Sequence, residues 1–408
     1  MKKITLCFSI VIICNCTSIT QWILQHNNVT TLYDIQFVNN LTGWSIGVNS
    51  VILKTTNGGV NWINQQSNLS AGKNLIGLSM INENTGYISG WFETIVKTTN
   101  GGVNWVVISD GPIGQGNSWN SSFFLNDQNG WICGFLGVIK RTTNGGISWD
   151  SLNTGNSTPL REIEFINSQT GWVAGDGGYL RKTTNGGTNW SLQITGTTAD
   201  FWYNSLQFIN NNSGWVVGYD NIIYSTTNSG SNWDTLSTLP GICVHFANAL
   251  TGWVGGNAGA VYKTTNGGTI WLQQNNPVSS FITSFYFYND SLGWASVGGR
   301  IINTTNGGTY VAVEPISNDS PVEYKLFQNY PNPFNNETTL EFSIMKAGLV
   351  RLEIFNSIGQ RIDTIIEQQL NPGKYKINWE ADKYSSGFYF CRLRVNKYTE
   401  TKIIILNK

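Results

Sequence analysis

Short stretches of alternating apolar and polar residues follow one another along most of the chain, and Gly or Asn separates one stretch from the next. In residues 33–37, for example, Ile35 and Phe37 alternate with polar side chains. A two-residue period of this kind is typical of a β-strand with one buried face. The pattern therefore predicts a protein of many short strands joined by tight turns, with little helix.

The strand pattern is periodic, and three landmarks mark each period. A segment Thr-Thr-Asn-Gly-Gly-x-x-Trp, or a close variant, recurs with its Asn at positions 57, 100, 144, 185, 228, 266 and 306. A Gly-aromatic pair precedes each copy, with the aromatic residue at Trp44, Tyr87, Trp131, Trp172, Trp215, Trp253 and Trp294. A large apolar residue stands seven positions earlier still, at Phe37, Met80, Phe124, Phe165, Phe208, Phe246 and Phe287. Four strands per period of about forty residues predict the blades of a seven-bladed β-propeller.

The two ends of the repeat region complement each other. The seventh copy lacks its Trp, whereas residues 21–25, with Trp22, resemble the strand that follows the other copies. We therefore expect the N-terminal strand to complete blade seven by pairing with a strand near residues 300–305, which leaves no open edge. The Asn-Gly pairs suit tight turns, and each repeated Trp is expected between blades, so both have structural roles.

The N-terminus has the layout of a secretory signal peptide. Lys2 and Lys3 precede an apolar run at residues 6–13, and small or polar residues follow up to Ser18. Cleavage is expected after Ser18 or Thr20, so residues 1–20 are assigned to the signal. Lipidation of Cys14 or Cys16 is the alternative. The apolar run is too short to span a bilayer, so no transmembrane segment is expected after signal removal.

Composition excludes several classes of function. The chain has no net charge and only 12% charged residues, so nothing indicates nucleic-acid binding. Beyond the signal, Cys133, Cys243 and Cys391 are isolated and are expected to be buried apolar residues. The two histidines, His26 and His245, are far apart, and no cofactor or metal site is expected.

A second region follows the repeats. Residues 313–323 contain two prolines and are expected to form a linker between the propeller, residues 21–312, and a C-terminal domain, residues 324–408. The domain has alternating segments near residues 338–344, 349–356, 375–379, 388–395 and 401–406. About seven short strands predict a small immunoglobulin-like β-sandwich, so the whole chain is expected to be all-β.

The repeated box resembles the Asp-box of the BNR repeat superfamily, with Asn in place of the usual Asp. Its period is similar to that of propellers of the photosystem II assembly and stability factor family. This resemblance implies the fold but not one function, because Asp-box propellers include sialidases, xyloglucanases and non-enzymatic binders. Sialidases use an arginine triad, and only Arg161 and Arg300 remain outside the repeat pattern here. An enzyme is therefore not expected.

The C-terminal domain resembles the type A C-terminal sorting domain of the type IX secretion system. The residues that carry this resemblance are Leu-Phe-Gln-Asn-Tyr-Pro-Asn-Pro-Phe-Asn at 326–335, Ile-Phe-Asn-Ser-Ile-Gly-Gln at 354–360, Gly373, Tyr375, Trp379, Gly387, Tyr389 and Lys-Ile-Ile-Ile-Leu at 402–406. The resemblance implies that residues 324–408 engage the type IX machinery. It also implies that the protein is secreted or lies on the outer surface of a Gram-negative bacterium.

One face of the propeller is expected to carry a binding site. The connections between blades and the turns between second and third strands share this face, and they vary in sequence as functional loops do. Their aromatic and charged residues suit sugar stacking or a protein contact, and the candidates are Trp91, Phe92, Glu93, Trp119, Phe135, Asp176, Trp202, Tyr203, Tyr219, Asp220 and Arg300. We expect an extracellular glycan or protein as the ligand. The alternative is a glycoside hydrolase that uses Glu93 with Asp176 or Asp220.

Overall fold

The computed structural model describes residues 21–27, 30–114, 116–195, 201–308, 314–317, 321–382 and 384–408, and the expected signal peptide lies outside this part of the chain. The chain divides into one unit at Gln21–Ala312 and a second that includes Val313–Lys408. No helix among the described residues combines the length and apolarity needed to cross a membrane.

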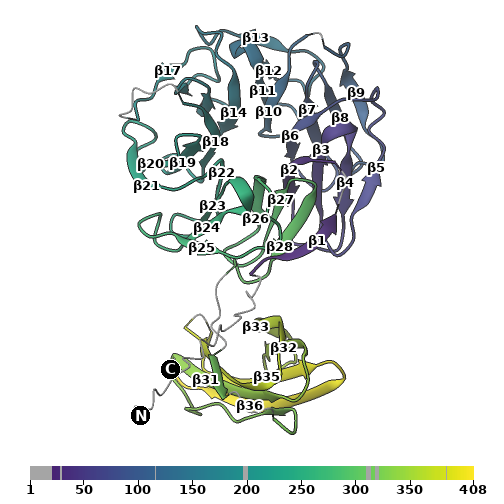
Figure 1. Ribbon diagram of the computed structural model, residues 1–408. Coiled ribbons are helices and arrows are strands. Elements are labelled where there is room, and N and C mark those ends of the chain that lie inside the picture. The colour runs from purple at the N-terminus through teal and green to yellow at the C-terminus, as the bar shows by residue number, and fades with distance from the viewer. Residues whose placement is uncertain are drawn as a thin grey trace, which may run out of the picture. The chain divides into compact units, whose positions relative to one another are not determined.

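The first unit is a seven-bladed propeller in its described residues, and each blade is a four-stranded antiparallel sheet (Figure 1). The first strands of the blades contact one another around the central axis. Blades one to three contain β2 (Leu32–Phe37), β3 (Gly43–Gly47), β4 (Ile52–Thr55) and β5 (Ile63–Gln65); β6 (Leu75–Met80), β7 (Gly86–Gly90), β8 (Ile95–Thr98) and β9 (Val106–Ser109); and β10 (Trp119–Phe124), β11 (Gly130–Gly134), β12 (Ile139–Thr142) and β13 (Asp150–Leu152).

The remaining blades repeat this arrangement. Blades four to six contain β14 (Leu160–Phe165), β15 (Gly171–Gly175), β16 (Leu180–Thr183) and β17 (Ser191–Leu192); β18 (Tyr203–Phe208), β19 (Gly214–Gly218), β20 (Ile222–Thr226) and β21 (Asp234–Thr238); and β22 (Cys243–Phe246), β23 (Gly252–Gly255), β24 (Val261–Thr264) and β25 (Leu272–Gln274). Blade seven contains β26 (Ile282–Phe287), β27 (Gly293–Val297), β28 (Arg300–Thr304) and β1 (Ile23–Asn27). Short 3-10 helices lie at η1 (Val48–Ser50), η2 (Phe135–Gly137) and η3 (Asn257–Gly259).

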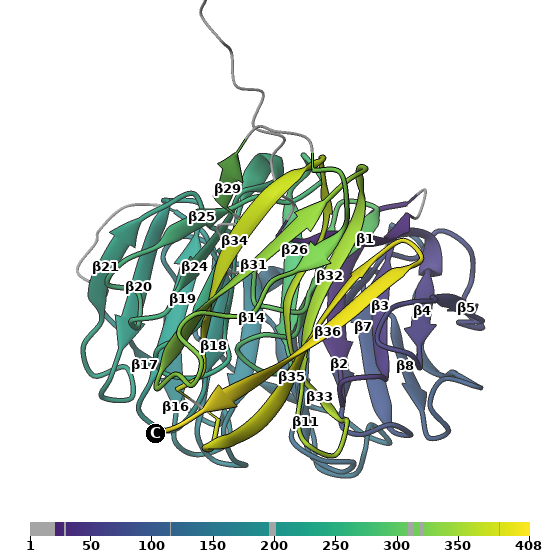
Figure 2. The ribbon, with the colours of Figure 1, turned by 90° about the horizontal axis from the view of Figure 1, so that it is seen from below.

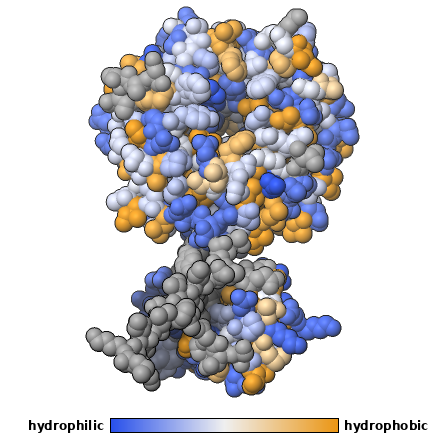
Figure 3. All heavy atoms as spheres, viewed as in Figure 1, coloured by the Kyte–Doolittle hydropathy of each residue, from blue (hydrophilic) through white to orange (hydrophobic). Residues whose placement is uncertain are grey.

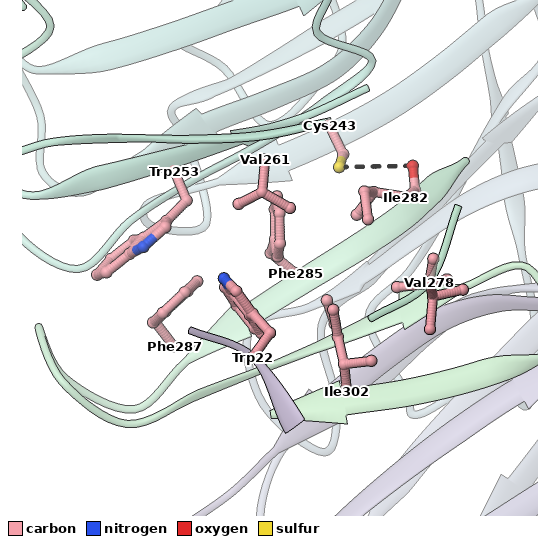
Figure 4. Packing of buried hydrophobic residues seen from close by; sticks show 11 residues of the cluster. Trp22, Cys243, Trp253, Val261, Val278, Ile282, Phe285, Phe287 and Ile302 are labelled. Carbon is pink, nitrogen blue, oxygen red and sulfur yellow. Dashed lines mark hydrogen bonds between the residues drawn. The ribbon is translucent and has the colours of Figure 1, made fainter. Parts of the chain in front are cut away.

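Strand β1 closes the ring in the manner expected from the unmatched N-terminal segment. It pairs antiparallel with β28, with Ile23 opposite Asn303 and Asn27 opposite Arg300. Trp22 is fully buried against Trp253, Phe285 and Phe287, as Figure 4 shows. Its indole N–H donates to Gln274 Oε1 over 2.9 Å. The first and last parts of the propeller sequence thus share one sheet and one core.

The three landmarks of the sequence meet in one inter-blade contact. In blades four and five, the Phe208 ring stacks on Trp172 of the preceding blade, 3.5 Å between centroids, and its edge meets Trp233 of its own blade at 5.9 Å. Phe37, Phe124, Phe165 and Phe246 repeat both contacts. The Gly before each strand-two aromatic leaves room for the Phe ring: a Cβ on Gly171 would lie 2.5 Å from Phe165.

The repeated box is a hydrogen-bonded turn. In blade two, Thr98 Oγ1 accepts the backbone N–H of Asn100 and of Gly102, and Asn100 Oδ1 accepts the N–H of Asn104. The same bonds recur in blades one and three to six. This geometry supports a structural role for the seven Asn residues.

The second unit contains two four-stranded antiparallel sheets, and Figure 2 shows its long strands, among them β32, β35 and β36. One sheet has the order β29-β34-β31-β30 and the other β33-β32-β35-β36. The strands are β29 (Glu314–Ser317), β30 (Lys325–Leu326), β31 (Glu337–Ile344), β32 (Gly348–Phe355), β33 (Arg361–Leu370), β34 (Gly373–Glu380), β35 (Gly387–Val395) and β36 (Tyr398–Leu406).

Two features of the second unit differ from the sequence prediction. Glu314–Ser317, inside the expected linker, forms β29, because its backbone pairs with the edge of β34. The expected strands also omitted β33, whose pairing with β32 includes two register shifts that disturb simple alternation. The burial of Cys133, Cys243 and Cys391 is confirmed.

Candidate functional site

The start of each blade and its turn between second and third strands lie side by side on one face, which we call the variable face. Backbone bonds join them: the N–H of Trp91 donates to Asn74 O, Phe135 to Ser118 O, and Tyr219 to Trp202 O. Each blade thus presents two neighbouring positions on this face. Blade five fills both with aromatic side chains.

Trp202 and Tyr219 form the most exposed pair among the sequence candidates. Their rings meet edge to face, 5.6 Å between centroids, and 47% and 48% of their surfaces are exposed. The guanidinium of Arg161, in blade four, lies 5.2 Å from the Trp202 ring centroid. A cation at this distance fixes the indole without burying it.

Asp176 holds Arg161 in place. Arg161 Nε donates to Asp176 Oδ1 over 2.6 Å, and its Nη2 donates to Oδ2 over 3.2 Å. The N–H of Gly178 in the same turn donates to Phe201 O, directly before Trp202. Blade four therefore supports the exposed pair of blade five from two sides. We call Arg161, Asp176, Trp202 and Tyr219 the aromatic platform.

Two candidates are buried, contrary to the prediction of exposed binding residues. Trp119 is 1% exposed and packs with Ile95 and Ile132. Tyr203 has no exposed surface and packs beside Trp172 and Leu206. Both are the first residue of an innermost strand, whose side chain turns into the core between blades. They cannot contact a ligand.

Trp91, Phe92 and Glu93 form a separate turn in blade two. Trp91 and Phe92 are half-buried, and their rings meet edge to face at 6.4 Å. The buried Lys73 lies 5.5 Å from the Phe92 ring and forms a 2.8 Å ion pair with Asp110. The sequence candidates of blades two and five are thus built from separate local contacts.

The last three candidates differ in their environment. Asp220 accepts the Tyr224 hydroxyl at 2.8 Å and the N–H of Ile222 at 3.1 Å, so it shapes its own turn. Phe135, in η2, is 40% exposed. Arg300 is exposed at the start of β28, opposite Asn27.

Carboxyl groups on the innermost strands escaped the sequence analysis. Asp34 accepts the Ser284 hydroxyl at 2.7 Å and the N–H of Leu78 in the next blade at 3.0 Å. Glu162 accepts the Ser121 hydroxyl at 2.6 Å. Burial raises the pKa of Asp34 to about 6 and that of Glu162 to about 8.

Glu164 completes this set. It accepts the N–H of Phe208 over 2.6 Å, and burial raises its pKa well above the usual range. The signal that could have found these residues is an acidic side chain on a first strand, where the matching positions of the other blades carry no carboxyl group. In the described part of the chain, no three His, Cys, Asp or Glu side chains are grouped to hold a metal ion.

Apolar and polar residues are mixed over the propeller surface seen in Figure 3, without one dominant apolar area. A hollow of about 770 Å³ lies where Glu164 and Phe208 meet the turn at residues 210–213.

Two families of known proteins match the chain. The family described as photosynthesis system II assembly factor YCF48 matches residues 15–109, 63–161 and 154–345, and the secretion system C-terminal sorting domain matches residues 328–407. The protein is thus a BNR-repeat propeller with a sorting domain for type IX secretion. The chain belongs to the family of the photosynthesis system II assembly factor YCF48. The sorting domain implies a secreted or cell-surface location in Bacteroidetes.

Solved structures share the propeller fold. YCF48 bound to a D1 peptide is 22% identical with a TM-score of 0.60, over 70% of this chain and 97% of that chain. PorZ of Porphyromonas gingivalis, a surface component of the type IX secretion system, is 14% identical with a TM-score of 0.56, over 93% of this chain and 60% of that chain. The Niastella koreensis GH74 enzyme is 16% identical with a TM-score of 0.53, and the match covers 70% of this chain and 44% of that chain. No curated protein matches the chain.

Proposed function

We propose that the protein is a non-enzymatic binding protein, exported by the type IX secretion system, that holds an extracellular glycan or protein on the aromatic platform. The exposed pair of Trp202 and Tyr219 on the Arg161–Asp176 ion pair carries this proposal. Residues 1–20 act as the signal peptide and residues 324–408 as the sorting domain. The route therefore leads through the inner membrane and then across the outer membrane.

Pre-organisation supports binding at the platform. Arg161 restrains the inner side of Trp202, and the bidentate bond from Asp176 restrains Arg161, so a ligand meets a ring that is already ordered. Less side-chain entropy is then lost on binding. The D1 peptide in the YCF48 structure supports binding as an activity of propellers in this family.

The hydrolase alternative has less support. Asp176 is paired with Arg161, and Asp220 accepts hydrogen bonds from Tyr224 and Ile222, so both carboxylates have a structural role in their own surroundings. Glu93 stands in the separate turn of blade two. The likeness to the GH74 enzyme shows the fold alone.

Binding is tested with the purified protein on a glycan array and on a panel of extracellular proteins. For a hit, Trp202→Ala with Tyr219→Ala should weaken the affinity about tenfold or more, because each aromatic contact contributes roughly 0.5–1.5 kcal/mol beyond its buried area. Tyr288→Ala is the matched control, since Tyr288 is 49% exposed in a turn of the opposite face. Equal affinity of the double variant and the wild type would refute the platform as the site.

A further inference from the structure

The segment at residues 326–335, which carries the resemblance to sorting domains, makes hydrogen bonds within the domain itself. Asn332 Oδ1 accepts the N–H of Ile405 over 2.9 Å, and the N–H of Phe334 donates to Ile405 O over 3.0 Å. Gln328 Nε2 donates to Ile403 O over 2.7 Å. These bonds cover the C-terminal part of the free edge of β36, at residues 403–406. Gln328, Asn332 and Phe334 of the motif therefore serve the fold of the domain itself.

The sheet β33-β32-β35-β36 has an apolar area on its outer face. Along β35, Tyr389, Cys391 and Leu393 are buried, so Phe388 and Phe390 between them point outward. The register places Ile405 opposite Phe388 and Ile403 opposite Phe390. Phe388 is 61% and Ile403 51% exposed. A single antiparallel sheet in water normally has polar residues on such a face.

The same face is cationic further along the strands. Arg392 lies opposite Glu353, and Arg394 opposite Arg351, in the next two outward pairs of β35 and β32. Glu353 is buried and forms two ion pairs. Its Oε1 lies 2.9 Å from Arg361 Nη1, and its Oε2 lies 3.8 Å from Arg394 Nε. The Arg392 guanidinium lies 4.2 Å from the centre of the Phe355 ring.

Acidic residues do not balance these arginines. Outward positions of β32 and β35 carry Glu353 against Arg351, Arg392 and Arg394, and Arg361 at the start of β33 adds a fourth arginine; in the backbone register, Glu367 lies opposite Arg351. The charge of the face is therefore net positive. The face combines Phe388, Phe390, Ile403 and Ile405 with Arg351, Arg361, Arg392 and Arg394, and we call it the outer sheet face.

We propose that the outer sheet face is the surface through which the sorting domain docks onto a protein of the type IX machinery, one whose matching surface is apolar and flanked by carboxylates. The partner is expected to carry carboxylates because the arginines on the outer sheet face exceed the acidic groups around them, and charge complementarity favours an acidic surface opposite them. Phe and Arg side chains next to each other are typical of the residues that dominate protein interfaces. The inference does not depend on the aromatic platform of the propeller.

The full-length protein in a host with the type IX apparatus provides the test. Phe388→Ser with Ile403→Ser should lower the exported fraction about tenfold or more, with periplasmic accumulation, because central apolar contacts dominate the affinity of an interface. Arg392→Glu with Arg394→Glu should do the same, and Lys at both positions should restore part of the export. Ile358→Ser is the matched control, since Ile358 is 82% exposed in the turn between β32 and β33. Wild-type export of the folded Phe388/Ile403 variant would overturn the proposal.

Protease digestion of the periplasmic fraction would reveal whether a variant has failed to fold. A cross-linking experiment tests the proposal without relying on those variants. The photoreactive residue p-benzoylphenylalanine at position 388 should cross-link to a type IX component during export, and at position 358 it should not. Equal labelling from both positions, or none from position 388, contradicts the proposal. A cross-link from position 388 to a second copy of this chain assigns the face to self-association and also overturns it.

Discussion

At the scale of single residues, the Asn of each repeated box acts through its oxygen. Asn100 Oδ1 accepts the N–H of Asn104 at 2.9 Å and the Thr98 hydroxyl at 3.1 Å, whereas its side chain is otherwise exposed. A carboxylate offers the same acceptor. This explains how Asn replaces the Asp of the related Asp-box without a change of turn geometry.

Substitutions at Asn100 test this interpretation. Asn100→Asp should leave the free energy of unfolding nearly unchanged, because the carboxylate can accept both hydrogen bonds. Asn100→Ala should lower it by about 1–3 kcal/mol, since each lost bond contributes about 0.5–1.5 kcal/mol. Urea unfolding of the purified protein measures both. An Asp variant as unstable as the Ala variant would show that the amide nitrogen is needed.

A second residue-scale prediction concerns Glu162. Its pKa is raised from the usual 4.5 to about 8, so the folded protein holds a proton that the unfolded chain has lost at pH values between these two. Stability should therefore fall as pH rises through that window. His245, with its pKa lowered to about 4, has the opposite effect, but only below its ordinary pKa of 6.5.

The melting temperature of the propeller should consequently decrease from pH 6.5 to pH 8.5. Glu162→Gln should reduce this slope, because the amide does not titrate. Glu83→Gln serves as the control for loss of a carboxylate, since Glu83 is an exposed acidic residue of the turn after β6. A slope unaffected by Glu162→Gln would contradict the assignment.

At the scale of elements, closure of the ring depends on the segment that contains Trp22 and β1. Trp22→Ala should lower the free energy of unfolding by about 3–5 kcal/mol, as for other large aromatic residues removed from a core. The indole is fully buried and spans the contact between blades six and seven. Trp202→Ala, at an exposed indole, should cost far less. Comparable losses in the two variants, measured by urea unfolding, would argue against closure by this segment.

At the scale of the whole molecule, the propeller and the sorting domain are separate units, and each has its own core. A chain that ends at residue 312 should therefore fold but remain in the periplasm, because it lacks the sorting domain. Fractionation of a host with the type IX apparatus, with immunoblotting for the propeller, measures this. Export of the truncated chain would show that the sorting signal lies elsewhere.

The sequence by itself determined the propeller, the seven blades, the partner strand of residues 21–25 and the sorting domain. These features depend on turn chemistry and on a period repeated many times, both of which are local and can be read without knowing distant contacts. Burial of Cys133, Cys243 and Cys391 was also predicted from the sequence, because the three cysteines are isolated from one another and free cysteines are usually buried. The aromatic residues of the variable face are different.

Only the tertiary structure decided which of those residues face solvent. Trp202 and Tyr203 are adjacent in sequence, yet one is half exposed and the other fully buried, because neighbouring side chains of an extended chain point to opposite sides and Tyr203 begins β18 with its ring in the core. The ion pair that supports the platform depends on the fold of blade four, and the contacts of Asp34 with Ser284 and of Glu162 with Ser121 depend on the packing of neighbouring blades. The reason is that strand pairing within a blade and packing between blades bring together side chains that are 15 to 250 residues apart in the sequence, and no local pattern predicts those contacts.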